Sequence, residues 1–392
     1  MWKHYTLGEV CAATQGVQIS KSNQISNAKE GYKRYLYISD FKHDKKLKYV
    51  EDIYPKKNVS PNDLIVSNTG SQGEVYRGID GILSNNLFKV SVDSTLVDKD
   101  FLFHFLKSPL FIDFQNERTR GSTQPHMGHK NFLSTPISLP PLAEQQRIVA
   151  KLDVAFAEID EAISTAESKE SGVQALKTSI LSKLLNNKSN GWESSYLEGV
   201  SSFISRGISP KYIESGGVRV LNQKCIRNHR INYDLARRHD IDLKKVSEER
   251  FIRLGDILIN STGQGTLGRV AQVRKEPDEL TTIDSHITIV RPKSEIFYLD
   301  YFGYAAIAIE KIIQDAGQGT SGQTELAKSK VQNDFQICFP RSCSEQEAEV
   351  KKLDIVFKEI EIALKNLTKS KTNLYSLKSA ILAQKLQSSE AA

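Results

Sequence analysis

The sequence predicts an α+β protein in which two mixed α/β globular segments are joined by two long antiparallel helices that form a coiled coil. Three observations predict this class: an internal repeat, a heptad-like apolar pattern inside it, and short β-rich runs between its two copies. In chain order, the expected parts are a first globular segment at 1–143, a first long helix at 144–187, a second globular segment at 188–344, and a second long helix with a short tail at 345–392.

The repeat aligns Glu144–Asn187 with Glu345–Ser388 without a gap, at a constant offset of 201 residues. Fifteen of the 44 aligned positions are identical. A gap-free match of this length indicates one structural unit used twice, related by a pseudo-twofold axis.

Both copies carry apolar residues in the 4-3 alternation that is typical of a coiled-coil seam. A helix of 44 residues is about 66 Å long, too long for one globular segment to bury, so each helix is expected to pack on the other. A whole globular segment separates the copies, which favours an antiparallel pair. Charged residues interrupt the seam at the same two places in each copy, Glu170 and Lys177 in the first and Lys371 and Lys378 in the second. The predicted seam residues are Leu152, Phe156, Ile159, Ile163 and Ile180, with Leu353, Phe357, Ile360, Leu364 and Ile381.

The two globular segments share anchors but not their full sequences. The run 63–70 matches 256–263, and each run reads as a buried strand that ends at a glycine. Short β-rich stretches such as 35–38 and 287–290 are broken by Gly, Asn and Asp, while apolar stretches near 101–111 and 298–313 suggest helices. Each segment is therefore predicted to mix helix and strand.

Composition excludes several classes of protein. The chain is 39% apolar and 26% charged, which is typical of a globular protein. It has no run of 18 apolar residues, so we expect no membrane partner. Four cysteines without zinc-ligand spacing favour a reducing, cytoplasmic location. The excess positive charge lies on the globular segments, +4 on residues 1–143 and +3 on 188–344, while the two repeated segments sum to zero and Glu390 brings the net charge to +6. This distribution weakly favours a polyanionic partner.

Motifs for catalysis are weak. A GxGxxG occurs at 263–268, but the residues after it, 269–273, read as a strand rather than the helix of a dinucleotide site, so we interpret it as a hairpin connection. The chain has no GxxxxGK[ST] phosphate loop. His126 and His129 lack an accompanying carboxylate or cysteine cluster. The sequence thus predicts no catalytic residues, no metal site and no cofactor in this chain.

Clusters of cations with amide side chains indicate DNA contact instead. Arginine matches guanine edges, Gln and Asn match adenine edges, and lysine mainly neutralises phosphate. A charged run is also compatible with a solvated surface, so these residues are candidates only. The candidates are Lys42, Lys45, Lys46, Arg118, Arg120 and Gln124 in the first segment, and Lys224, Arg227, Arg230, Arg237, Arg238 and Gln323 in the second.

The duplicated layout resembles the specificity (S) subunits of type I restriction–modification enzymes. The shared motifs are Asp-Ile-Leu-x-x-x-x-Gly with a following Gly-Arg at 256–269, its weaker counterpart at 63–70, and Leu-Pro-Pro-Leu-Ala-Glu-Gln-Gln-Arg-Ile-Val at 139–149. Leu-Lys-x-x-Ile-Leu occurs in both helices, and Gly-x-x-Pro occurs at 207–210. The resemblance covers essentially the whole chain, although the second copy lacks the Pro-Pro before its helix.

The resemblance implies that each globular segment is a target recognition domain that reads one half of a split, asymmetric DNA sequence. The helices would set the distance between the halves and bind two methyltransferase (M) subunits, joined by restriction/translocase (R) subunits. S-adenosylmethionine, ATP and Mg²⁺ would then belong to those partners, and this chain would be non-catalytic, in the cytoplasm of a bacterium or archaeon. Ile148, Val149, Ala155 and Leu176, outside the seam, would be free to contact the M subunits.

Three other functions remain open from the residues alone. A stand-alone nuclease would need a metal-binding carboxylate set, which the sequence does not reveal. A nucleotide-binding oxidoreductase would rest on Gly263–Gly268 alone. A coiled-coil scaffold that does not bind DNA would be disfavoured if Arg227, Arg230, Arg237 and Arg238 lined one face.

Overall fold

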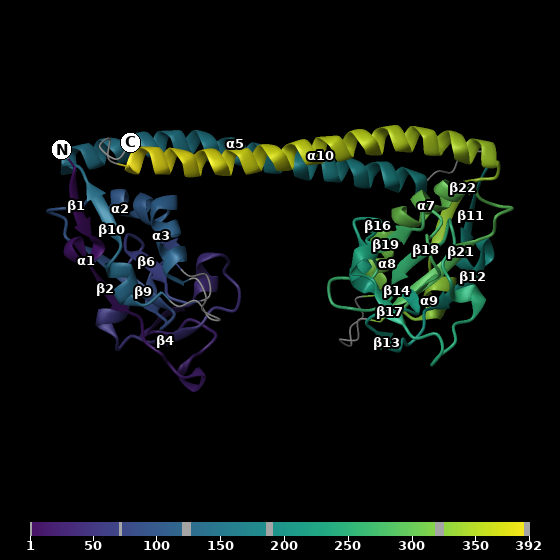
Figure 1. Ribbon diagram of the computed structural model, residues 1–392, viewed down its shortest axis with the longest axis horizontal. Coiled ribbons are helices and arrows are strands. Elements are labelled where there is room, and N and C mark those ends of the chain that lie inside the picture. The colour runs from purple at the N-terminus through teal and green to yellow at the C-terminus, as the bar shows by residue number, and fades with distance from the viewer. Residues whose placement is uncertain (1, 70–72, 120–126, 186–190, 318–324, 388–392) are drawn as a thin grey trace. The chain divides into compact units, whose positions relative to one another are not determined.

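The computed structural model describes residues 2–69, 73–119, 127–185, 191–317 and 325–387. The chain divides into two compact units: unit 1 comprises Met1–Glu167 with Thr368–Ala392, and unit 2 comprises Ser168–Leu367. Each unit contains one α/β part and a portion of both long helices, α5 (Leu142–Leu185) and α10 (Cys343–Leu386) (Figure 1). The predicted α+β class with two long helices is confirmed.

In its described residues, the α/β part of unit 1 contains three small sheets and four short α-helices. Its strands are β1 (Lys3–Thr6), β2 (Cys11–Gln15), β3 (Tyr32–Leu36), β4 (Tyr49–Glu51), β5 (Asn58–Val59), β6 (Leu64–Ser67), β7 (Val75–Tyr76), β8 (Gly81–Leu83), β9 (Leu87–Val92) and β10 (Pro136–Leu139). Its helices are α1 (Leu7–Val10), α2 (Lys99–Leu106), α3 (Pro109–Thr119) and α4 (His129–Leu133), with 3-10 turns η1 (Lys21–Asn23), η2 (Ile38–Phe41) and η3 (Pro55–Lys57).

The α/β part of unit 2 repeats this plan with one added hairpin. Its strands are β11 (Trp192–Tyr196), β12 (Ser201–Arg206), β13 (Tyr212–Ile213), β14 (Val218–Leu221), β15 (Ile226–Arg227), β16 (Arg230–Ile231), β17 (Arg237–His239), β18 (Ile257–Asn260), β19 (Val270–Gln272), β20 (Thr281–Ile283), β21 (Ile287–Pro292) and β22 (Gln336–Pro340). Its helices are α6 (Leu197–Val200), α7 (Leu299–Ala308), α8 (Glu310–Ala316) and α9 (Lys328–Asn333), with 3-10 turns η4 (Gln223–Cys225), η5 (Tyr233–Leu235) and η6 (Glu248–Arg250).

The larger antiparallel sheets of the two units have equivalent strand orders. The sheet of order β2-β9-β6-β7 in unit 1 corresponds to β12-β21-β18-β19 in unit 2. A second sheet, β4-β3-β8-β5 or β13-β17-β14-β20, contains one parallel pair in each case. The second sheets share three strands in the same order, β4-β3-β8 and β17-β14-β20, and differ in the fourth, which is β5 beside β8 in unit 1 and β13 beside β17 in unit 2. The central strands β6 and β18 are buried along their whole length, which explains why both read as continuous apolar runs in the sequence. The repeat therefore extends from the helices to the α/β parts.

The GxGxxG segment connects a hairpin. β18 and β19 pair in antiparallel fashion on either side of it, as the sequence predicted. Gly268 has a φ of 78°, and a Cβ there would lie 2.8 Å from Gln314 Cα. Glycine is thus required by backbone conformation and close packing, and no helix follows to hold a dinucleotide.

A buried glutamine joins the start of each long helix to its α/β part. In α5, the Gln145 side chain accepts a hydrogen bond from the backbone N–H of Asp98 (2.8 Å) and donates to the carbonyl oxygens of Leu96 (2.9 Å) and Pro140 (2.8 Å). In α10, Gln346 makes the same three bonds, to Tyr298, Ile296 and Pro340. Both side chains are fully buried. The Glu-Gln pair shared by the two copies thus includes a structural anchor.

Two of the charged breaks in the seam, Lys177 and Lys378, are cations packed on aromatic rings of the other helix. Lys378 of α10 lies 4.7 Å from the ring centroid of Phe156 in α5 and pairs with Asp160 (2.7 Å). In unit 2 the roles of the helices are exchanged, because Lys177 of α5 lies 5.8 Å from the ring centroid of Phe357 in α10. These contacts match through the offset of 201 and fix the antiparallel pairing within each unit.

The seam residues differ in burial. Within unit 1, Leu152, Phe156, Ile159 and Ile163 are buried, and within unit 2 Leu353 and Ile360 are buried. Ile180, Phe357, Leu364 and Ile381 are half-buried. Near the ends of the helices, Leu181 and Leu382 are the more buried residues.

One expectation for the helices is wrong. Ile148 is buried in the core of unit 1 and cannot contact a partner protein, because the first turns of α5 are embedded in the α/β part. Val149 is half-buried against the same core, whereas Leu176 is 52% exposed. Within the described residues, no helix has the length and apolar character needed to cross a membrane.

Candidate nucleic-acid interface

A tight hairpin in unit 2 positions two of the predicted arginines. β15 and β16 pair so that Arg227 lies opposite Arg230. The two residues between them, Asn228 and His229, have φ values of 52° and 59°. Positive φ at both central positions is the geometry of a type I′ turn, which most non-glycine residues avoid. The turn thus presents four successive polar side chains at the tip of the hairpin.

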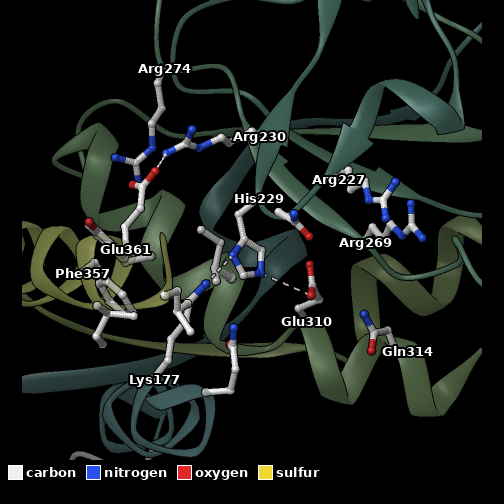
Figure 2. Close-up of a pocket in the computed structure, with 16 residues that line it drawn as sticks. Lys177, Arg227, His229, Arg230, Arg269, Arg274, Glu310, Gln314, Phe357 and Glu361 are labelled. Carbon is white, nitrogen blue, oxygen red and sulfur yellow. Dashed lines mark hydrogen bonds and ion pairs between the residues drawn. The ribbon is translucent and has the colours of Figure 1, made fainter. Parts of the chain in front are cut away.

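The hairpin tip forms one wall of a cavity of about 800 Å³ in unit 2 (Figure 2). Its other walls come from α7, α8 and the portions of α5 and α10 that belong to this unit. Two lining side chains, Glu310 and Glu361, are carboxylates. With His229 neutral, the lining has a formal charge of +3, because five lining residues are cationic: Lys177, Arg227, Arg230, Arg269 and Arg274.

His229 lies between a cation and a carboxylate in the middle of the cavity. Its Nδ1 atom is 3.2 Å from Nζ of Lys177, and its Nε2 atom is 3.3 Å from Oε1 of Glu310 (Figure 2). Because an ammonium group only donates, this geometry assigns the ring proton to Nε2, which donates to Glu310. Burial lowers the pKa of Lys177, while the nearby carboxylates of Glu310 and Glu361 oppose that shift. Charge in this central part is therefore compensated.

The arginines around this centre differ in their partners. Arg230 pairs with Glu361 of α10 at 2.5 Å, and Arg274 lies 5.0 Å from the ring centroid of Tyr304. Arg269 donates to two backbone carbonyls, of Gly265 (2.8 Å) and Ile226 (3.3 Å). Arg227 is exposed and has no hydrogen bond or ion pair with any residue that the structure describes. Both Arg227 and Arg269 line the cavity, and they lie on the same side of the view in Figure 2.

The other predicted residues of unit 2 do not join this cavity. Arg237 of β17 is exposed, with its guanidinium 3.4 Å from the ring centroid of Tyr212. Its neighbour Arg238 pairs with Glu279. Successive residues of a strand point to opposite faces, so the four arginines do not line one face. Lys224 is exposed on η4.

The described candidates of unit 1 lie in two places. Lys42, Lys45 and Lys46 are exposed in the loop after η2, where Lys42 pairs with Glu74 at 3.0 Å. Arg118 is exposed on α3 and donates to Ser134 Oγ at 2.7 Å. Arg120, Gln124 and Gln323 lie outside the described residues.

Sequence reasoning missed three cations of the cavity: Lys177, Arg269 and Arg274. Lys177 was noted only as a break in the seam, although a charge inside an apolar seam was the available signal. Arg269 was noted only as the end of the Gly-Arg motif. Arg274 follows β19 by two residues and carries no local signal.

The aspartates of the repeated Asp-Ile-Leu motif have a structural role. Asp256 is fully buried and accepts two hydrogen bonds from the guanidinium of Arg291, each 2.8 Å long. Burial raises the pKa of Asp256, and Arg291 opposes that shift. The equivalent Asp63 pairs with Lys89 at 2.9 Å. These carboxylates hold strands together and do not face the cavity. Among the described residues, no group of three or more His, Cys, Asp or Glu side chains is arranged to hold a metal ion.

Comparison with known proteins identifies relatives. Residues 1–166 match the family described as the type I restriction modification DNA specificity domain. The chain is 31% identical over 156 residues to the type I restriction enzyme MjaVIII specificity subunit of Methanocaldococcus jannaschii, a match that covers 40% of this chain and 35% of that protein. The chain thus spans about a third of the length of that relative. With the type I restriction enzyme EcoKI specificity subunit of Escherichia coli K12 it is 21% identical, over 98% of this chain and 88% of the relative.

A solved structure has the same fold. It comes from work on the structural basis of complex assembly and conformational transition of the type I R-M system, and its TM-score with this chain is 0.72 at 20% identity, over 98% of this chain and 97% of that one. The specificity-domain match, the named relatives and the shared fold agree with the resemblance seen in the sequence. Residues 1–166 thus match the DNA specificity domain of type I restriction–modification systems, and the chain is similar to the specificity (S) subunits of those systems.

Proposed function

We propose that this chain is the DNA specificity subunit of a type I restriction–modification complex, and that it reads a bipartite, asymmetric duplex target. The observation that carries the proposal is that two units share the strand order of their larger sheet, β2-β9-β6-β7 and β12-β21-β18-β19, but carry different exposed side chains. Unit 1 presents lysines after η2, whereas unit 2 presents arginines on a hairpin and on β17. Two recognition domains that share a framework but differ in their exposed side chains would recognise two different half-sites of the DNA target.

We also propose that two M subunits bind the helix pair, one at each unit. In unit 1, Val154 and Leu377 are exposed apolar residues (64% and 48%). In unit 2 the residues at the offset of 201, Ile355 and Leu176, are exposed to nearly the same extent (66% and 52%). Large apolar side chains that stay exposed at matched positions support one partner binding the same way twice.

The chemistry in this proposal belongs to the partners. The M subunits would flip and methylate adenine with S-adenosylmethionine, and R subunits would use ATP and Mg²⁺. This chain would contribute DNA sequence recognition without a catalytic residue or a cofactor of its own, in the cytoplasm of a bacterium or archaeon.

Co-expression with the M subunit encoded beside this chain, followed by sequencing of adenine methylation in host DNA, tests the proposal. The expected result is one motif with two different specified halves separated by unspecified bases. A complex that forms but methylates no motif, or that methylates a palindrome, would contradict it.

The docking proposal has its own test. Ile355→Glu should reduce the number of M subunits per chain from two to one, measured by native mass spectrometry. Lys358→Glu, an exposed polar position on the same helix, is the matched control and should keep two. Two bound M subunits in the Ile355→Glu variant would refute the assignment of this surface.

A further inference from the structure

Among the described residues, three guanidinium groups of the cavity of unit 2 have no ion pair with a carboxylate: Arg274, which lies over the ring of Tyr304, and Arg227 and Arg269. Arg227 has no partner among the residues that the structure describes, and Arg269 donates only to backbone carbonyls of Gly265 and Ile226. The second of these carbonyls belongs to the residue before Arg227, so the Arg269 guanidinium is bound to the backbone beside Arg227. Two adjacent cations repel each other unless an anion lies between them.

The carboxylates of the cavity are committed elsewhere. Glu310 accepts from His229 (3.3 Å) and from the backbone N–H of Val270 (2.8 Å). Glu361 is bound to Arg230. Neither acid is therefore paired with Arg227 or Arg269, and these two residues account for two of the three excess positive charges of the lining.

Comparison with unit 1 shows how this arrangement arises. There, the acid at the position of Glu361 is Asp160, which binds Lys378 through both oxygens (2.7 and 2.8 Å). In unit 2 the hairpin supplies Arg230 to Glu361, and Lys177 bonds to His229 instead. In unit 2, Arg230 of the added hairpin β15–β16 thus neutralises the helix carboxylate that, in unit 1, is neutralised by a lysine of the other helix. It also brings Arg227 to the cavity.

We propose that Arg227 and Arg269 form a binding site for a phosphodiester group of the DNA backbone. A guanidinium group presents planar, paired N–H donors that match two phosphate oxygens, and two such groups can hold one phosphate from two sides. Gln314, which lines the same side, offers an uncharged donor (Figure 2). The site rests on the proposed DNA-binding function and assigns it a backbone contact that does not depend on base sequence.

The test measures duplex binding by the full chain in its complex with the M subunit, for the wild type and for the double variant Arg227→Gln/Arg269→Gln. Loss of one phosphate contact should lower the slope of log K against log salt by about 0.9 and weaken binding about tenfold at fixed salt, on target and non-target duplexes alike. The methylated motif should stay the same. The matched control is Arg341→Gln, an exposed arginine of unit 2 that pairs with Glu193 outside the cavity.

Each other outcome is decisive. A wild-type complex that does not bind DNA removes the proposed function itself. A double variant that binds with the slope and affinity of Arg341→Gln overturns the phosphate site alone. A changed motif would mean that these arginines read bases, which also overturns a backbone contact.

A small phosphorylated molecule is the other source of the same chemistry. If the site takes such a ligand, ADP or inorganic phosphate should raise the unfolding temperature of the wild-type chain and not of the double variant, while duplex binding by the two stays equal. That result would overturn the DNA assignment. Without ligand, the wild type and the double variant should have the same unfolding temperature, because Arg227 is exposed and a glutamine at position 269 can still bond to the nearby carbonyls. If the double variant unfolds at a lower temperature, the single variant Arg227→Gln replaces it in this experiment.

Discussion

The buried glutamine at the start of α5 makes a measurable contribution to the stability of unit 1. Gln145→Ala removes three hydrogen bonds and leaves one backbone N–H and two carbonyl oxygens without these partners. At about 0.5–1.5 kcal/mol for each bond, the free energy of unfolding should fall by roughly 2–4 kcal/mol. The matched control is Gln146→Ala, the next residue on the same helix, whose side chain is exposed and whose loss should cost within about 0.5 kcal/mol.

Tryptophan fluorescence can follow each unit separately. The chain has two tryptophans, of which Trp2 packs on the core of unit 1 and Trp192 on the core of unit 2. Urea unfolding of Gln145→Ala in a Trp192→Phe background therefore reports on unit 1 alone. Gln346→Ala in a Trp2→Phe background repeats the experiment on the equivalent bonds of unit 2. If Gln145→Ala and Gln146→Ala unfold at the same urea concentration, with the same dependence of the unfolding free energy on urea, the conclusion that these bonds anchor the helix is refuted.

Three further predictions concern the α/β parts and the helices. Burial lowers the pKa of His104 below its usual value of 6.5, and its carboxylate partner opposes the shift. The folded state therefore binds fewer protons than the unfolded state, and the free energy of unfolding of unit 1 should decrease as the pH falls below about 6.5. His104→Gln should weaken this pH dependence, followed by Trp2 fluorescence; equal pH profiles for the variant and the wild type would contradict the prediction. Cys343 is exposed and the other three cysteines are buried, so iodoacetamide should label Cys343 first in the folded chain, as peptide mass spectrometry can check. A Cβ on Gly207 would lie 2.1 Å from a carbonyl oxygen of β20, so Gly207→Ala should destabilise unit 2 by about 1–3 kcal/mol, whereas Gly172→Ala, at an open position inside α5, should stabilise it by about 0.5–1 kcal/mol.

The sequence predicted the helices and hairpins well because their signals are local. The seam residues recur every three or four positions, and the glycines at 263–268 mark a turn between two apolar runs. The expectation for Ile148 failed because periodicity within a helix does not tell where an α/β part packs on it.

The cavity could not be predicted from the sequence in the same way. Lys177, Arg227 and Glu310 come from three elements, α5, β15 and α8, and Arg269 from the connection before β19; they meet only in the folded unit. Each residue alone resembles an ordinary surface charge. Their chemistry depends on which pairs are neutralised, and that depends on tertiary packing.

The exchange of roles between the helices has a consequence for how such a chain can be built. Each unit takes its lysine from one helix and its aromatic ring from the other: Lys378 with Phe156, and Lys177 with Phe357. Half of the chain, with one α/β part and one helix, therefore carries a lysine and a ring that cannot satisfy each other within the same copy. Two identical half-chains could form both lysine–ring contacts by pairing with each other as a dimer. Duplication and fusion of the gene for such a half-chain is therefore a direct route to this protein. After fusion, each α/β part could diverge in sequence while the helix contacts stayed the same.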